Sequence, residues 1–78
     1  MLKDDLMKDL GIPEECFDTH ESDLIVLAEG RAKEIGMYLL DKGIGFSMFL
    51  SNVPGQSWYG KYCFDIPFMA GGKNDTKL

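Results

Sequence analysis

Alternation of apolar and polar residues on both sides of a turn, over residues 45–66, constrains the fold more than any other feature of the sequence. Every second residue from Phe46 to Leu50 is apolar, which is typical of a half-buried strand. The segment Val53-Pro54-Gly55-Gln56 favours a type II turn, because proline presets its second position and glycine tolerates the positive φ of its third. These patterns predict an antiparallel β-hairpin. Its core-facing side chains are predicted to be Phe46, Met48, Leu50, Trp58, Tyr62, Phe64 and Ile66.

A segment with helical periodicity precedes this hairpin. Asp18 is a suitable N-cap, Glu21 completes a pattern like a capping box, and Gly43 supplies a stop signal. Between them one apolar stripe is predicted: Leu24, Leu27, Ala28, Ala32, Ile35, Tyr38 and Leu39. Arg31 lies within the stripe, so its stem packs while its guanidinium reaches solvent or pairs with an acid of the N-terminal segment, or it faces a ligand or partner. We therefore expect a central amphipathic helix packed on the hairpin.

A shorter helix is predicted at the N-terminus, since Leu2, Leu6 and Leu10 form one stripe that ends at Gly11. A chain of 78 residues has room for one core. The predicted fold class is thus α+β, with a short N-terminal helix, a central helix and a C-terminal antiparallel hairpin. We expect a single domain over residues 1–69 and a flexible C-terminal tail over residues 70–78, which is polar and contains glycine.

Charge is unevenly distributed along the chain. Residues 1–29 have nine acidic and two basic side chains, a net charge of −7, whereas residues 30–78 have a net charge of +2, which gives −5 in total. An acidic segment repels nucleic-acid phosphates and attracts basic protein surfaces. The alternative explanation for the charge is solubility alone. The N-terminus lacks the layout of a signal peptide, and no uncharged run has the composition of a membrane span. We therefore expect a cytoplasmic protein with no membrane association.

Few residues suggest chemistry. Cys16 and Cys63 are expected to be free thiols, since two cysteines alone rarely make a disulfide scaffold. Cys16 and His20 lie among acids and could form a metal- or thiol-dependent site, but their spacing matches no known zinc site. No nucleophile, base or phosphate-binding motif can be assembled from the sequence. The sequence therefore predicts no enzyme, no cofactor and no metal.

The leading hypothesis is a small non-enzymatic interaction module, such as a phage or mobile-element accessory protein that inhibits or adapts a larger, basic-surfaced protein partner. A homodimer is expected, because the open edges of a hairpin and the second apolar face of the central helix need cover. The alternatives are a dimeric nucleic-acid-associated regulator, which the acidic charge disfavours, and the metal- or thiol-dependent activity at Cys16 and His20. The candidate partner-binding residues are Asp4, Asp5, Asp9, Glu14, Glu15, Arg31, Phe49, Tyr59 and Lys61.

Overall fold

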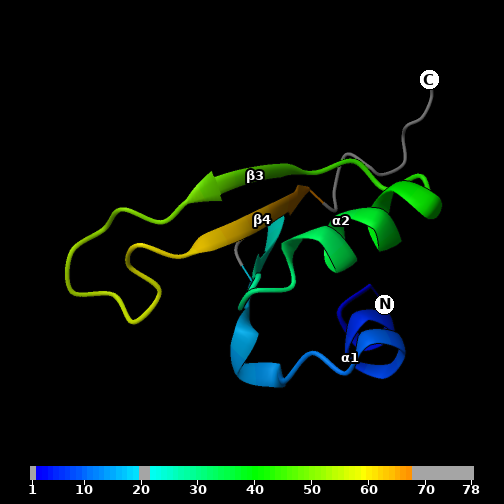
Figure 1. Ribbon diagram of the computed structural model, residues 1–78, viewed down its shortest axis with the longest axis horizontal. Helices are drawn as coiled ribbons and strands as arrows, with labels where there is room; N and C mark the ends of the chain where they lie inside the picture. The colour runs from blue at the N-terminus through cyan, green and yellow to red at the C-terminus, as the bar shows by residue number, and fades with distance from the viewer. Residues whose placement is uncertain (1, 20–21, 68–78) are drawn as a thin grey trace.

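The computed structural model describes residues 2–19 and 22–67, which form two helices, a short 3₁₀ turn and one four-stranded sheet (Figure 1). In chain order the elements are α1 (Leu2–Leu10), η1 (Glu14–Cys16), β1 (Phe17–Thr19), β2 (Asp23–Leu27), α2 (Ala32–Asp41), β3 (Ser47–Leu50) and β4 (Tyr62–Pro67). The predicted α+β class, with an N-terminal helix, a central helix and a C-terminal hairpin, is confirmed. The predicted tail at 70–78 lies outside the described residues.

The order of the strands in the sheet is β1-β2-β4-β3, and all neighbouring strands are antiparallel. From β2 the chain crosses through α2 to β3, and β4 then returns between the two. Because β2 and β3 are both antiparallel to β4, they run parallel to each other. The predicted hairpin is thus one half of a larger sheet, and among the described residues only its β3 side has no neighbouring strand.

Both helices cover the same face of this sheet. On that face Val26 lies opposite Phe64, and α2 packs so closely there that a Cβ on Gly36 would lie 3.8 Å from the Phe64 ring. Phe17 lies opposite Val26, and Lys3 of α1 lies 5.9 Å from the centre of the Phe17 ring. The fully buried side chains on this side of the sheet are Leu6, Leu24, Val26, Ile35, Leu39, Phe64 and Ile66, and Cys63 is fully buried on the other face.

The predicted start of the central helix at Asp18 is wrong. Asp18 lies in β1, and the run from Leu24 to Leu27 forms most of β2. Between β2 and α2 the chain makes a tight turn: Glu29 and Gly30 have φ of 49° and 78°, and the Arg31 N–H donates to the Ala28 carbonyl at 2.9 Å. Consecutive positive φ angles are incompatible with a right-handed helix, so the helix begins only at Ala32. Glu21 lies outside the described residues.

The predicted turn of the hairpin is confirmed, but its predicted faces are partly wrong. The Gln56 N–H donates to the Val53 carbonyl at 3.2 Å, and Gly55 has a φ of 91°. However, β4 begins at Tyr62, so residues 51–61 form a loop rather than the start of a strand. Met48 and Tyr62, predicted to face the core, are 47% and 58% exposed. Leu50, also predicted to face the core, is 50% exposed. The reason is that α2 packs over Phe64 and covers neither the β3 side of this face nor the start of β4, where Leu50 lies opposite Tyr62.

Candidate partner-binding surfaces

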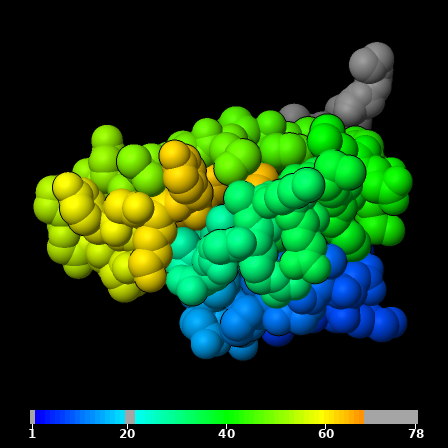
Figure 2. Space-filling view, in the orientation of Figure 1, coloured from blue at the N-terminus to red at the C-terminus, as the bar shows by residue number. Residues whose placement is uncertain are grey.

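The acidic N-terminal segment remains at the surface. The blue segment in Figure 2, which comprises α1 and η1, forms one side of the molecule next to α2. Asp4, Asp5 and Glu15 are exposed and have no ion-pair or hydrogen-bond partner among the described residues. Glu14 is also exposed, and its carboxylate pairs with Lys3 at 3.3 Å. This side of the molecule therefore presents carboxylates to solvent, where a basic surface could contact them.

Asp9, another predicted binding residue, has a structural contact. Its carboxylate accepts a hydrogen bond of 2.7 Å from the Tyr38 hydroxyl, which joins α1 to α2. That hydrogen bond, together with burial and the charge of Asp9 itself, raises the pKa of Tyr38 to about 12. Asp9 is therefore less suited than Asp4 or Asp5 to contact a partner.

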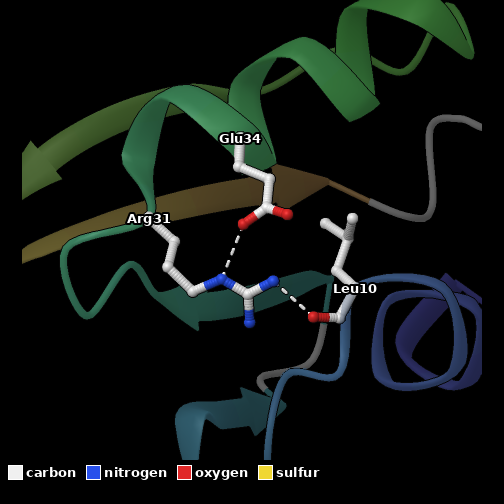
Figure 3. A network of polar contacts seen from close by, with 3 residues as sticks. All are labelled: Leu10, Arg31 and Glu34. Carbon is white, nitrogen blue, oxygen red and sulfur yellow. Dashed lines mark hydrogen bonds and ion pairs between the residues drawn. The ribbon is translucent and has the colours of Figure 1, made fainter.

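Arg31 also connects the two helices (Figure 3). Its Nε lies 2.7 Å from the Glu34 carboxylate, and its Nη2 donates to the carbonyl of Leu10, the last residue of α1. The hydrogen bond from Arg31 holds the pKa of Glu34 below its usual value. A cation at the C-terminal end of a helix is favourable, because the unpaired carbonyls there have a partial negative charge. Of the two roles considered for Arg31, this geometry matches the structural one, but its acidic partner is Glu34 of α2 and not an acid of the N-terminal segment, which contributes the Leu10 carbonyl instead.

The three predicted hairpin residues do not form one patch. Phe49 lies in β3 on the sheet face that the helices do not cover, whereas Tyr59 and Lys61 lie in the loop of residues 51–61. The Lys61 ammonium pairs with Glu29 at 3.3 Å. Phe49 and Lys61 line separate hollows, so a ligand in one hollow need not contact both residues.

The hollow that Phe49 lines was not anticipated from the sequence. It has a volume of about 460 Å³ and lies between the uncovered sheet face and the loop of residues 51–61. Its lining includes Asp18, Ile25, Phe49, Ser51, Gln56 and Trp58. The only indication of this hollow in the sequence is the uncharged stretch around Trp58. The position of the loop over the sheet depends on strand pairing between distant segments.

The outer strand β3 forms a further exposed surface. All four of its residues are exposed, and within residues 2–19 and 22–67 β4 is its only neighbour in the sheet. On the helix side its Met48 and Leu50 are exposed, as are Met37 and Leu40 of α2. The strand contains neither charge nor proline, the usual features that prevent edge-to-edge pairing.

The cysteines offer no reactive thiolate. Cys16 and Cys63 are both buried free thiols, and burial raises the pKa of each. Since the thiolate is the reactive form, a raised pKa lowers reactivity at neutral pH. In residues 2–19 and 22–67, no three His, Cys, Asp or Glu side chains are grouped so as to hold a metal ion. His20 lies outside these ranges.

Neither a protein-family model, nor a curated protein, nor a solved structure matches this chain at a significant level. Neither of the two described helices is long and apolar enough to cross a membrane.

Proposed function

We propose that the protein is a small non-enzymatic interaction module that binds the basic surface of a larger protein and thereby inhibits or adapts it. The observation that supports this function is the exposed carboxylates of Asp4, Asp5 and Glu15, which have no partner among the described residues and lie in a segment with a net charge of −7 over residues 1–29. Carboxylates of this kind steer a basic partner toward the surface and raise the rate of association.

Capture of a partner by the tagged protein from cells that express it tests this function. Asp4→Lys, Asp5→Lys and Glu15→Lys are combined, and Asp9 is left intact because its reversal would also break the bond to Tyr38. We expect the triple variant to associate more slowly with the captured partner, and we expect binding by the unaltered protein to weaken with salt. The partner is then purified, and both rate constants are measured.

A matched pair of single variants controls for net charge. Asp4 and Asp41 are both exposed and both lie in helices, but Asp41 is at the end of α2. Asp4→Lys and Asp41→Lys change the net charge equally, and only Asp4→Lys is expected to slow association. Equal effects would show that net charge, and not this surface, governs binding. Normal binding by the triple variant would refute the proposed surface.

A second proposal concerns self-association through β3. Its observation is the uncharged edge strand, all four residues of which are exposed, together with the exposed Met37 and Leu40 of α2. Two copies related by a two-fold axis can pair their β3 strands antiparallel and extend the sheet across the dimer. Light scattering should then give twice the 8.8 kDa mass of the chain. A mass of one chain at high concentration would exclude the dimer.

A further inference from the structure

We infer that the hollow beneath the loop of residues 51–61 receives a basic side chain of the partner, best an arginine. This inference rests on the proposed function and specifies a site of contact for it. The hollow follows the acidic η1 directly in the chain, since Asp18 of its lining is three residues after Glu15. A short stretch of chain therefore joins the acidic residues of η1 to the lining of the hollow.

The lining of the hollow combines the two kinds of group that bind a guanidinium. Apolar and aromatic surfaces line the hollow. Ile25 and Phe49 project from the sheet face that the helices do not cover, and Trp58 lies in the loop opposite. The carboxylate of Asp18 lies on the same face, directly opposite Ile25 in the neighbouring strand. Arginine stacks on aromatic rings and pairs with carboxylates, which lysine does less well. A carboxylate has about four acceptor positions, so Asp18 can bind a cation in addition to its other contacts.

The loop that forms the upper wall is fixed by its own hydrogen bonds. At its base the Ser51 N–H donates to the Lys61 carbonyl at 2.9 Å, and the Gly60 N–H donates to the Ser51 carbonyl at 2.8 Å. Within it, the buried Ser51 hydroxyl donates to the Gln56 side chain at 3.4 Å, and the Tyr59 N–H donates to the Gln56 carbonyl at 3.1 Å. A wall held in this way is formed before the ligand arrives, which reduces the entropy cost of binding.

Charge on the strands favours a basic occupant over a neutral one. The four strands contain no lysine or arginine, and their only charged side chains are Asp18, Asp23 and Asp65. Asp18 and Asp65 lie opposite Ile25 on its two sides, and Asp23 is two residues before Ile25. Because side chains alternate along a strand, all three carboxylates project from the face with the hollow. Of the three, Asp18 lines the hollow, so a cation there interacts most directly with the Asp18 carboxylate.

Titration of the full chain with short peptides tests the site. The probes are Gly-Arg-Gly and its neutral counterpart Gly-citrulline-Gly, both with blocked ends, and the readout is the NMR signals of the Trp58 indole and the Ile25 and Phe49 amides. We expect saturable shifts with the arginine peptide and a Kd on the order of 1 mM, as a single side chain provides. The citrulline peptide, which has the same shape without the charge, should not saturate.

Two isosteric variants locate the charge. Asp18→Asn should weaken binding of the arginine peptide about two- to fivefold, the usual range for one exposed charge contact, whereas Asp41→Asn, at an exposed position at the end of α2, should leave its binding unchanged. Absence of saturable shifts would overturn the inference, as would equal binding of the citrulline peptide or equal weakening by the two variants.

The same variants separate this inference from the proposed function. If a partner is captured and Asp18→Asn binds it normally, the site is wrong and the function stands. If no partner with a basic surface is captured while the arginine peptide still saturates the hollow, the function is wrong and the site stands.

Discussion

The two faces of the sheet differ in composition and in what covers them. The face beneath the helices has buried apolar residues in neighbouring strands, such as Val26 beside Phe64 and Leu24 beside Ile66. The other face has Asp18, Asp23 and Asp65 as well as the buried Leu27 and Cys63, and beside its hollow a loop with Trp58 takes the place of a helix. Burial of apolar surface supplies most of the stability of a small domain, whereas exposed charge supplies little. We therefore expect stability to depend on the helix face and binding to depend on the open face.

Phe64 and Phe49 provide the strongest test of this comparison. They are the same residue type in adjacent strands on opposite faces, and Phe64 is fully buried whereas Phe49 is 39% exposed. Phe64→Ala should lower the free energy of unfolding by about 3–5 kcal/mol, which is close to the whole stability of so small a domain. Phe49→Ala should cost clearly less, because less apolar surface returns to water. Urea denaturation of both variants measures the difference, and equal losses would contradict the assignment of the two faces.

The turn before α2 determines where that helix lies, and it gives the next largest effect. A side chain on Gly30 meets nothing within 4 Å, but its φ of 78° is strained for any residue with a Cβ. Gly30→Ala should therefore destabilise the fold by about 1–2 kcal/mol. Gly45 has equally open surroundings without a positive φ, so Gly45→Ala is the matched control. A comparable loss in both variants would show that backbone strain at Gly30 is not responsible.

The same turn explains why the central helix was predicted to be too long. Leu24 to Leu27 is a continuous apolar run, and such a run fits a buried helix or a buried strand equally well. The partners that decide the matter lie in β4, about 40 positions later in the chain. Locally, only Gly30 signalled the break. The turn at Val53–Gln56 and the leucine stripe of α1 were predicted correctly because their determinants are neighbouring residues.

The candidate site was less accessible to prediction than the fold. The acidic surface can be predicted from the number of charged residues alone, because Asp4, Asp5 and Glu15 lie in a segment too polar to be buried. The hollow requires Asp18 and Ile25 to meet a loop that follows them by more than 25 residues. Similarly, Phe49, Tyr59 and Lys61 were grouped by strand alternation, which does not apply once residues 51–61 form a loop. Local patterns therefore predict elements, whereas the site depends on how the elements pair.

A pH-dependent contribution to stability is expected from the bond between Tyr38 and Asp9 on the helix side. Since the hydrogen bond raises the pKa of Tyr38 from its usual value of about 10 to about 12, its stabilising effect is complete below pH 10 and is lost as the pH rises to about 12. Tyr38→Phe should therefore be less stable than the unaltered protein at pH 9, and the difference should disappear near pH 12. Absorbance titration should also lose its highest tyrosinate component in this variant. A difference that persists unchanged at pH 12 would refute the role of the hydroxyl.

The smallest effect on stability is expected at the open edge of the sheet. A substitution there should nevertheless abolish the proposed dimer. Leu50 is 50% exposed at the end of β3, so Leu50→Lys should change the free energy of unfolding by no more than about 0.5 kcal/mol. A lysine on an edge strand opposes pairing with a second copy, because burying its ammonium in a two-fold interface brings like charges together. If β3 mediates a dimer, light scattering should then show a monomer for Leu50→Lys and a dimer for the unaltered protein. Lys substitution of Val53, which is 51% exposed but lies in the loop, provides the matched control and should leave the dimer intact. Loss of the dimer in the Val53 variant alone would place the contact in the loop, and the edge of the sheet would then be free for another partner.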